Sequence, residues 1–335
     1  MVETLLKKET KTNLLLTNVN GKRQVKIFSG RANVPLAKEI CDYLQLPLGK
    51  INIKPFSDGE LYIQVEESVR GCDVFLIQPT CPPVNENIME LLIILDALKR
   101  ASAEKITVVM PYYGYGRQDR KAAGREPITA KLIADLLCDS GATRILALDL
   151  HATQIMGFFD VLVDHLFATP VLVEHVKSMG LKDIVVVSPD VGGVTRARAY
   201  AKKLNDAPIA ILDKRRPTDI HNTVEVINII GEIKGKTCII VDDMIDTAGT
   251  ITLGADLLKK EGAKEVLALV THPVLSGPAK ERIDKCPITS LIVTNSIQVL
   301  PERCPKKLKM LSVAPLLAEA IKRIHLDDSV SEMFS

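Results

Sequence analysis

Short apolar runs of strand length alternate with segments of helical periodicity along nearly the whole chain. The apolar runs predict strands at Val25–Phe28, Val74–Gln78, Ile106–Met110, Ile145–Leu148, Ile184–Val187, Ile209–Leu212, Cys238–Val241, Val266–Val270 and Leu291–Val293. The helical spacing predicts helices at Val34–Leu44, Asn87–Arg100, Thr129–Asp139, Pro170–Ser178, Thr195–Leu204, Thr250–Glu261 and Val313–Ile324. This alternation is typical of a doubly wound α/β architecture, with mainly parallel sheets flanked by helices. Ligands are then expected in loops at the carboxyl ends of strands.

Two parts of the chain resemble each other over one continuous stretch. Residues 134–151 can be laid on residues 255–272 without a gap, and ten of the eighteen positions are identical. Part of this similarity is common to any helix–glycine–strand unit, since Leu, Ala and Gly recur in such units. A gapless match of this length nevertheless predicts that one α/β unit was duplicated.

The stretch 241–250, VDDMIDTAGT, follows a predicted buried strand and precedes a predicted helix. At such a junction the backbone N–H groups of Thr247–Thr250 can converge on a phosphate, and the helix dipole favours the negative charge. Asp242 and Asp243 would repel a bare phosphate, but they suit a ligand that carries hydroxyl groups beside its phosphate, such as a ribose phosphate. The alternative interpretation is a strand that ends in a solvated acidic turn.

The same alignment places Asp246–Thr250 on Arg125–Thr129, where Pro127 removes a backbone donor. The first half is therefore predicted to keep the scaffold without this phosphate site. Two other stretches there suit a nucleotide: the acidic turn Phe56–Glu60, and Pro111–Lys121, which places three cations beside aromatic residues and glycines. A purine can stack on an aromatic ring while Arg and Lys hold polyphosphate. The alternative for the second stretch is a basic surface loop that pairs with nearby acids.

Composition narrows the class of protein. The 335 residues are 47% hydrophobic and 25% charged, which suits a globular protein of about two domains. The net charge of +2 gives no reason to expect nucleic-acid or membrane partners, and the longest apolar stretch, 88–98, is too short to span a bilayer. Seven scattered cysteines without a C-x-x-C pair predict reduced thiols in a cytoplasmic protein. Residues 1–22 have no signal-peptide core, so we expect a loosely held extension.

Predicted strand ends also carry groups suited to magnesium and phosphate chemistry. Asp190 follows a strand and is well placed for Mg²⁺, which usually binds one or two carboxylates plus substrate phosphates. His151 also ends a strand, although a lone histidine there is more often a hydrogen-bonded structural residue. Asp213–Arg216 carries three consecutive cations after a strand. Phosphoryl transfer needs such positive charge, yet an isolated charge run is usually a solvated hairpin.

Six short motifs occur together in the chain. They are Phe56–Glu60, Tyr113–Lys121, Asp149–His151, Ser188–Gly193, Asp213–Arg216 and Val241–Thr250. In this series they resemble class I ribose-phosphate pyrophosphokinases, and the match runs from about Val25 to the C-terminus. The last motif alone also resembles the ribose-phosphate loop of type I phosphoribosyltransferases. Each motif is weak by itself, whereas six in the same order are highly specific.

The resemblance implies roles for individual residues. It implies catalysis by Lys214, as the principal transition-state residue, and by Arg216, which contacts the substrates. It implies that His151 and Asp190 bind the metal and help to hold Mg-ATP. The implied ATP-binding residues are Phe56, Asp58, Gly59, Glu60, Arg117 and Gln118. The implied ribose 5-phosphate-binding residues are Arg216, Asp242, Asp243, Asp246, Thr247, Ala248, Gly249 and Thr250.

The resemblance also implies two duplicated phosphoribosyltransferase-like domains. We expect an ATP-binding domain at 23–168 and a ribose 5-phosphate-binding domain at 169–308, with the segment 309–335 packing back on the first domain. The family further implies a homohexamer built of dimers, activated by phosphate and inhibited by ADP at a subunit-interface site.

This chain departs from the family pattern in one loop. Where the family usually has a basic residue and a serine, it has Ala123 and Gly124. Because a cation and a hydroxyl are missing, we expect weaker dependence on phosphate or weaker inhibition by ADP. The alternative is a neutral change that Arg120 or Arg125 compensates.

In the implied reaction, the C1 hydroxyl of ribose 5-phosphate attacks the β-phosphorus of ATP, and AMP leaves. We find no strong general-base candidate in the sequence, so positioning and electrostatics are expected to supply most of the acceleration. One rival, a phosphoribosyltransferase that consumes the activated sugar, would have no need of a second half with nucleotide-type residues. Another, a catalytically silent regulatory relative, should have lost His151, Asp190, Lys214 or Arg216, and all four are present.

Overall fold

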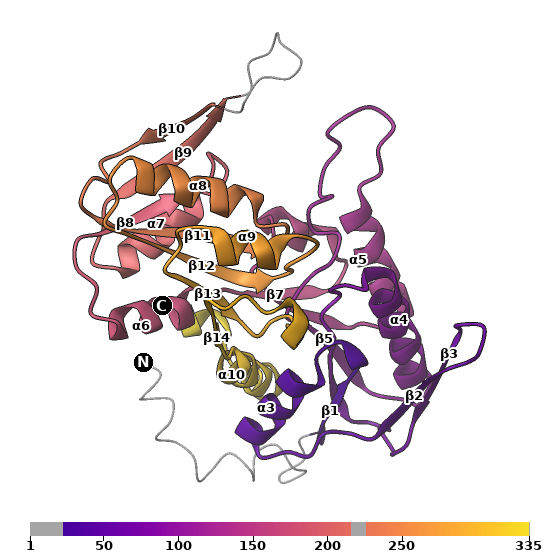
Figure 1. Cartoon of the computed structure of the whole chain (residues 1–335). Coiled ribbons are helices and arrows are strands. Elements are labelled where there is room, and N and C mark those ends of the chain that lie inside the picture. Colours follow the sequence, from indigo (N-terminus) through magenta and orange to yellow (C-terminus); the bar gives the residue numbers. More distant parts are fainter. Residues whose placement is uncertain (1–22, 216–225, 335) are drawn as a thin grey trace. The chain divides into compact units, whose positions relative to one another are not determined.

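The computed structural model describes residues 23–215 and 226–334, which form two compact units (Figure 1). Unit 1 comprises the described residues up to Leu166 together with Ser296–Gln298 and those from Ser312 onward. Unit 2 comprises Phe167–Asn295 and Val299–Leu311. Each unit contains a mainly parallel sheet and helices, which confirms the predicted α/β fold class. The expected extension 1–22 lies outside the described residues.

The main sheet of unit 1 has five parallel strands in the order β1-β4-β5-β6-β7. Its strands are β1 (Val25–Ser29), β4 (Asp73–Ile77), β5 (Lys105–Met110), β6 (Arg144–Leu148) and β7 (Leu162–Leu166). Nearly all side chains of β1, β4, β5 and β6 are buried, as expected of parallel strands covered on both faces. A separate antiparallel hairpin consists of β2 (Ile51–Pro55) and β3 (Leu61–Val65), and β3 packs on α4.

The helices of unit 1 include one from the C-terminal end of the chain. They are α3 (Val34–Leu44), α4 (Val84–Arg100), α5 (Thr129–Ser140) and α10 (Ala314–Leu326), with short 3₁₀ turns η1 (Arg31–Asn33), η2 (Thr153–Phe158) and η4 (Ser331–Phe334). Asn33 caps α3 by accepting a hydrogen bond from Leu36 N, and a proline follows in the first turn. Helix α10 packs on α3 (Figure 1). The last helix is therefore part of the first unit.

The sheet of unit 2 has seven strands in the order β10-β9-β8-β11-β12-β13-β14. All neighbours are parallel except β10, which pairs antiparallel with β9 at the edge. The strands are β8 (Ile184–Ser188), β9 (Ile209–Arg215), β10 (Val226–Ile230), β11 (Thr237–Ile245), β12 (Glu265–Pro273), β13 (Ser290–Thr294) and β14 (Leu308–Leu311).

Four helices and a short 3₁₀ turn accompany this sheet. They are α6 (Thr169–Ser178), α7 (Val194–Lys203), α8 (Gly249–Lys260), α9 (Ala279–Lys285) and η3 (Pro301–Arg303). Helix α7 packs against β8, β9 and β11, and α8 packs against β11 and β12. Helix α9 packs on α8, so it lies close to the turn that precedes α8.

The two units repeat one arrangement. The strands β4-β5-β6-β7 and β8-β11-β12-β13 are each four parallel neighbours whose order across the sheet is the order in which they occur along the chain, although β9 and β10 come between β8 and β11 in the sequence. The pairs α5–β6 and α8–β12 are the segments whose sequences match, which supports the predicted duplication. Each unit has its own apolar core, around residues such as Leu76 and Leu91 in unit 1 and Ile240 and Leu258 in unit 2.

The structure corrects the predicted bounds of several elements. Strand β12 ends at Pro273 rather than Val270, and α4 begins at Val84 rather than Asn87. Strand β11 continues beyond Val241 to Ile245, because β12 pairs with it as far as Pro273. Strand β9 continues to Arg215, because β10 pairs with it. The sequence analysis did not predict β3, β7, β10, β14 or α9, which are short and carry polar residues that interrupt their apolar patterns.

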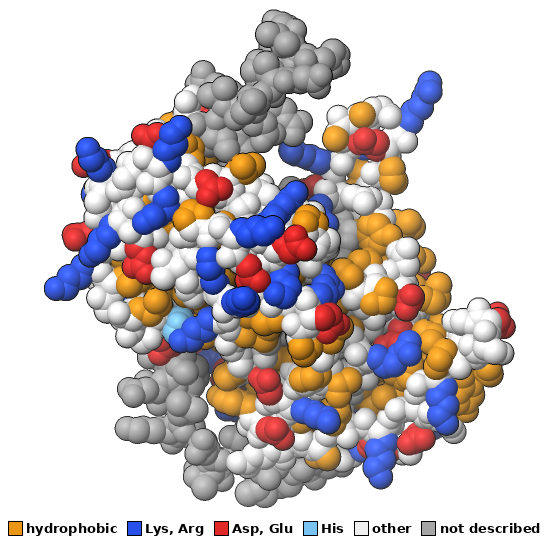
Figure 2. Space-filling model, in the orientation of Figure 1, with side chains coloured by type: hydrophobic (Ala, Val, Ile, Leu, Met, Phe, Trp, Pro, Cys, Tyr) orange, Lys and Arg blue, Asp and Glu red, His pale blue; other side chains and the backbone are white. Residues whose placement is uncertain are grey.

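Two observations bear on the surroundings of the protein. In residues 23–215 and 226–334, we find no helix long and apolar enough to cross a membrane. Acidic and basic side chains mix on the face seen in Figure 2, in line with the net charge of +2.

Candidate active site

The end of β11 and the start of α8 form the predicted phosphate turn. Ala248, the residue before α8, has φ 63° and ψ 2°, which is a left-handed conformation. A left-handed residue at this point directs consecutive backbone N–H groups to one side. The Ala248 side chain is buried, and its carbonyl accepts a hydrogen bond from Thr252 Oγ1 at 2.9 Å. The turn is thus fixed in a shape that suits an anion at the N-terminus of α8.

Residues that follow β12 brace this turn from outside. The backbone N–H of Leu275 donates to the carbonyl of Ile245 at 2.9 Å, and that of Ser276 donates to the carbonyl of Asp246 at 3.0 Å. These bonds continue the β11–β12 pairing past the last residues of the two strands. The backbone around Asp246 is therefore held by the sheet.

Helix α9 adds a positive charge to the turn. Nη1 of Arg282 donates to the carbonyl of Thr247 at 3.0 Å. The same nitrogen lies beside Gly249, close enough that an added Cβ there would stand 3.4 Å from it. A guanidinium at this place favours a bound anion.

The two acids of β11 lie against one arginine. Nη1 of Arg196, on α7, is 3.0 Å from Asp242 Oδ1 and 3.2 Å from Asp243 Oδ1. Burial and the charge of Asp243 raise the pKa of Asp242 well above its usual value, while Arg196 acts in the opposite direction. The acids lie within the strand rather than in a solvated turn, which argues against the alternative interpretation of this motif.

The acidic turn Phe56–Glu60 connects β2 and β3. The backbone N–H of Phe56 donates to the carbonyl of Glu60 at 2.7 Å, and Asp58 Oδ1 accepts from Glu60 N at 3.0 Å. Gly59 has φ 96°, a conformation that glycine adopts without strain. The Phe56 side chain is 54% exposed, and its ring meets Tyr62 edge to face with centroids 6.2 Å apart. A fixed, exposed aromatic ring offers a surface on which a planar ring can stack.

The basic stretch Pro111–Lys121 differs from the prediction in its aromatic residues. Tyr112 and Tyr113 are buried, and Tyr113 donates its hydroxyl to the carbonyl of Ala130 at 2.7 Å. These rings belong to the core and cannot stack on a purine. Tyr115, the third tyrosine of this stretch, is half-buried and donates its hydroxyl to Asn85 Oδ1 at 2.6 Å, whereas Phe56 in the acidic turn is 54% exposed.

Arg117 and Gln118 lie exposed in the loop that leads to α5. Gln118 Oε1 accepts from Thr129 Oγ1 at 2.5 Å, and its carbonyl accepts from Ala130 N at 3.2 Å. Both contacts tie the loop to the first turn of α5. The two side chains that the family resemblance implies at the ATP site are thus held on the surface of unit 1.

The two implied metal ligands belong to different units. His151 follows β6 in unit 1 and Asp190 follows β8 in unit 2, and both are exposed. Asp190 Oδ1 accepts from Gly193 N at 2.8 Å, which orients the carboxylate. Among the described residues, no three His, Cys, Asp or Glu side chains come together as a ready-made metal site. An exposed strand-end carboxylate fits Mg²⁺, which takes most of its other ligands from water and substrate phosphates.

The segment that carries Lys214 and Arg216, called the arm below, begins in the β9–β10 hairpin at the sheet edge. Lys214 belongs to β9, where its backbone is paired with Ile227 of β10. Arg216, the other residue implied in catalysis, lies outside the described residues. Lys214 therefore lies near the edge of the same sheet whose strand β11 leads into the phosphate turn.

Comparisons with known proteins connect this arrangement to one family. The family model for the N-terminal domain of ribose phosphate pyrophosphokinase matches residues 25–141, and that for the phosphoribosyl synthetase-associated domain matches residues 206–335. A ribose-phosphate pyrophosphokinase of Bacillus subtilis is 60% identical over 320 residues, which cover 96% of this chain and 100% of that protein. The chain belongs to the ribose-phosphate pyrophosphokinase family.

Other relatives agree with this assignment. Ribose-phosphate pyrophosphokinase 1 of spinach, Spinacia oleracea, is 58% identical over 313 residues, which cover 93% of each chain. The crystal structure of phosphoribosylpyrophosphate synthetase from Mycobacterium smegmatis aligns with a TM-score of 0.86 at 43% identity, covering 90% of this chain and 99% of that one. The resemblance carried by the six motifs is confirmed at the level of family and fold.

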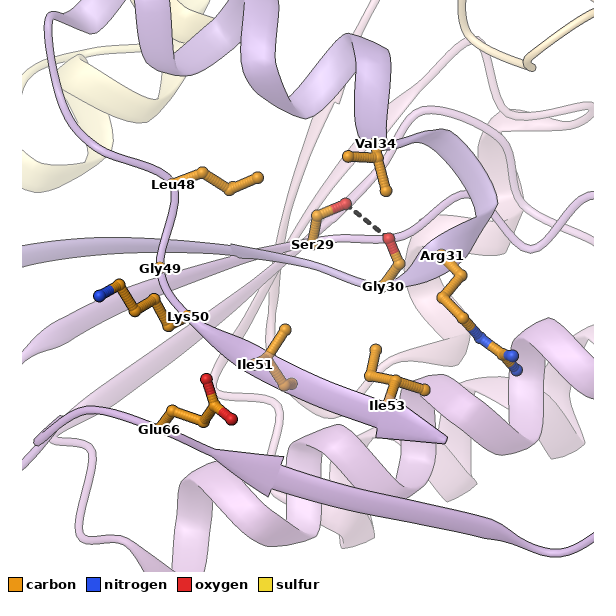
Figure 3. A pocket seen from close by; sticks show the side chains of 10 residues that line it. All are labelled: Ser29, Gly30, Arg31, Val34, Leu48, Gly49, Lys50, Ile51, Ile53 and Glu66. Carbon is orange, nitrogen blue, oxygen red and sulfur yellow. Dashed lines mark hydrogen bonds between the residues drawn. The ribbon is translucent and has the colours of Figure 1, made fainter. Parts of the chain in front are cut away.

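A hollow of about 360 Å³ in unit 1 lies beside the end of β1 (Figure 3). It is lined by Ser29, Gly30, Arg31, Val34, Leu48, Gly49, Lys50, Ile51, Ile53 and Glu66. Ile51 and Ile53 point from β2 toward the end of β1 in this view. None of the described residues implied in ATP binding by this pyrophosphokinase family lines the hollow, so we assign it no role.

Three contact residues of the candidate site were missed by sequence reasoning. Arg196, Arg282 and Tyr62 reach the acids, the phosphate turn and the Phe56 ring, respectively. Each stands outside the family's pyrophosphokinase motifs listed above, and an arginine on a helix surface is usually a solvated residue. Only the packing of α7 and α9 beside β11 and α8 reveals the two arginines.

Proposed function

We propose that the chain catalyses Mg²⁺-dependent transfer of the pyrophosphoryl group of ATP to the C1 hydroxyl of ribose 5-phosphate. The products are 5-phosphoribosyl 1-diphosphate and AMP. One observation carries the proposal: identity of 55–60% over nearly the full chain to proteins named ribose-phosphate pyrophosphokinase. The arrangement of acids, turn and helix at the end of β11 supports it in chemical terms.

The acceptor sugar is proposed to bind at the end of β11. Its 5-phosphate would bind the backbone N–H groups and hydroxyls of Thr247–Thr250, at the positive end of the α8 dipole. Asp242 and Asp243 would accept hydrogen bonds from the ribose hydroxyls, and Asp246 would complete the turn. The left-handed Ala248 and the Arg282 contact support this assignment because they fix the turn and make it more positive.

The donor is proposed to bind through residues of unit 1. The adenine would stack on the exposed Phe56 ring, with Asp58, Gly59 and Glu60 of the same turn reading its edge. Arg117 and Gln118 would contact the nucleotide from the loop before α5.

Magnesium is proposed as the metal of this site. His151 and Asp190 would hold it together with ATP. When bound, Mg²⁺ offsets the negative charge of the transferred phosphates. The exposed, oriented carboxylate of Asp190 supports this part of the proposal.

The proposed chemistry forms one bond and breaks one. The C1 oxygen of the sugar bonds to the β-phosphorus, and the bond between that phosphorus and the oxygen that bridges the α- and β-phosphorus atoms breaks. AMP keeps the bridging oxygen, and the hydroxyl proton passes to solvent. Lys214 and Arg216, carried by the arm that starts as the β9–β10 hairpin, would offset the charge that develops on the phosphate oxygens.

The proposal includes a homohexamer in the cytoplasm, with phosphate and ADP as effectors. Leu132 and Leu136 are exposed one turn apart on α5, and Met89 is exposed on the adjoining α4. Exposed apolar side chains on neighbouring helices support an interface with another subunit. All seven cysteines are free thiols, which supports a reducing compartment.

An assay for AMP and 5-phosphoribosyl 1-diphosphate tests the proposal. Purified protein with ATP, ribose 5-phosphate and Mg²⁺ should form both products, and omission of the metal should stop the reaction. Lys214→Ala should lower turnover by about 100-fold or more while ATP binding is retained. Lys203→Ala, an exposed lysine on α7, is the matched control and should keep wild-type turnover. Absence of AMP from wild-type protein would refute the proposed function, and full turnover by Lys214→Ala would refute the role of the arm.

A further inference from the structure

Arg196 bridges two acids and lies outside the six motifs described above. Its Nη1 contacts a carboxylate oxygen of both Asp242 and Asp243, at 3.0 and 3.2 Å. The arginine side chain is 24% exposed, that of Asp242 is 21% exposed and that of Asp243 is 4% exposed. The three groups thus form a largely desolvated cluster at the end of β11, where a hydrogen bond between charged groups is strong.

The cluster needs this cation because two acids stand side by side. Adjacent carboxylates with little water around them repel each other, and one of them tends to take up a proton. A protonated carboxyl group becomes a hydrogen-bond donor and keeps fewer acceptor sites. Arg196 opposes that change for both acids at once, since a single nitrogen contacts Asp242 and Asp243.

The bridge also fixes the direction of one carboxylate. Asp242 Oδ1 accepts from Arg196 Nη1 and from the backbone N–H of Asp243, at 3.0 and 2.9 Å. Two donors on the same oxygen hold the plane of the carboxylate in place. Helix α7 packs directly against β11, so the arginine is delivered from a rigid neighbour.

We propose that Arg196 is a positioning residue, which orients Asp242 and Asp243 as hydrogen-bond acceptors for the hydroxyl groups of the pentose. It acts through the acids. This inference rests on the proposed binding of ribose 5-phosphate at β11. It assigns to α7 a part in selecting the acceptor sugar.

Steady-state kinetics of Arg196→Gln, Arg196→Lys and Arg198→Ala test this inference. Arg198 is exposed on the same helix two residues away and serves as the matched control. For Arg196→Gln, the KM for ribose 5-phosphate should rise about tenfold or more, while the KM for ATP stays within about twofold. Arg196→Lys should give an intermediate KM for the sugar, because it restores a charge without the planar fork. Arg198→Ala should match the wild type.

A second readout separates positioning from general support of the fold. The ratio of kcat/KM for ribose 5-phosphate to that for 2-deoxyribose 5-phosphate reports acceptance of the 2-hydroxyl hydrogen bond. It should fall several-fold in Arg196→Gln and stay at the wild-type value in Arg198→Ala. An unchanged ratio, or equal rises in the KM values for sugar and ATP, would overturn the inference.

The experiment still decides the question if Arg196→Gln does not fold or if the wild type is inactive. If circular dichroism shows that Arg196→Gln does not fold, Arg196→Lys decides: a raised sugar KM with a lowered ratio supports the role, and wild-type values overturn it. If the wild type and Arg198→Ala both fail to form AMP, the proposed function itself is wrong. If the wild type is active and the Arg196 variants show its KM for ribose 5-phosphate and its ratio of kcat/KM values, only the inference about Arg196 is refuted.

Discussion

Asp242 shows how a single residue of the site serves binding at the expense of stability. Its carboxylate lies beside that of Asp243 at the end of a buried strand, where both would be better hydrated in the unfolded chain. Arg196 offsets part of this cost, but the pKa of Asp242 is still raised by burial and by Asp243. Residues kept for a ligand often reduce the stability of the fold.

Replacing Asp242 by Asn should therefore stabilise the protein at neutral pH. A carboxyl group whose pKa is raised by folding favours the folded state below its unfolded pKa, about 4. That contribution is lost as the pH rises through the folded pKa. Unfolding temperatures measured from pH 4 to 8 should show an advantage of Asp242→Asn that grows with pH.

Asp42→Asn provides the control for this measurement, since Asp42 is exposed on α3. It should follow the wild-type profile throughout the pH range. If Asp242→Asn were less stable than the wild type at pH 8, the assignment of a raised pKa to Asp242 would be contradicted.

The Phe56 ring gives a second prediction at the residue scale. Phe56→Ala should raise the KM for ATP by about 5- to 100-fold, because stacking of a base on an aromatic ring contributes about 1–3 kcal/mol. Tyr62→Ala removes the edge-to-face support and should raise the same KM by about 2- to 10-fold. Initial rates with each substrate varied give these values. Tyr62→Phe keeps the ring and should resemble the wild type, whereas equal changes for ATP and ribose 5-phosphate would speak against the stacking role.

At the scale of elements, the side chain of Glu126 stabilises the backbone of the loop between β5 and α5. Glu126 Oε2 accepts hydrogen bonds from the backbone N–H groups of Ala122 and Ala123, at 2.7 and 2.8 Å. A carboxylate thus occupies backbone donors that could otherwise bind an anion. Gly124 has open space around it and does not need a left-handed backbone, so a side chain can be added there.

Substitution of this loop tests the expected loss of effector control. The wild type should respond weakly to phosphate or ADP, because Ala123 and Gly124 supply neither charge nor hydroxyl. Ala123→Arg combined with Gly124→Ser should lower the ADP concentration for half-inhibition by about tenfold, through a charge-assisted bond of about 1.5–3 kcal/mol. Ala123→Met with Gly124→Ala adds bulk without charge or hydroxyl and should leave the response unchanged. Strong phosphate activation and ADP inhibition of the wild type would disprove the expectation.

At the scale of the whole molecule, the chain returns to unit 1 after completing unit 2. Helix α10 packs on α3, and Ser312 hydrogen-bonds to Glu39 at the start of this return. Near the end of α10, His325 Nδ1 lies 2.9 Å from Asp73 Oδ2, and both side chains are buried. The C-terminal segment is therefore part of the packed structure of unit 1.

Loss of either member of the buried pair should destabilise the protein. His325→Ala or Asp73→Ala leaves a buried polar partner behind, at a cost of about 2–4 kcal/mol in the free energy of unfolding. Urea unfolding of the variants gives these values. The double variant should cost less than the sum of the two single changes, since the interaction is removed only once.

Asp328→Ala is the control for the pair, because Asp328 is exposed just beyond α10. It should change the free energy of unfolding by less than about 0.5 kcal/mol. Strictly additive effects of Asp73→Ala and His325→Ala would show that the two residues stabilise the fold independently.

The sequence by itself determined what depends on neighbours along the chain. Alternating apolar runs and helical spacing depend on the two backbone periodicities, so they predicted most strands and helices within a few residues. The phosphate turn was predictable for the same reason, because a strand, small residues and a helix start are consecutive at 241–250. The order of six such local motifs was enough to predict the family.

Only the tertiary structure decided which distant residues meet. It extended β11 through Asp242 and Asp243 by pairing with β12, and it buried Tyr112 and Tyr113. It also brought Arg196 to an acid 46 positions away and Arg282 to a turn 35 positions away. The physical reason is that burial and charge pairing depend on how helices pack on sheets, and no local pattern records which face of a helix that packing covers.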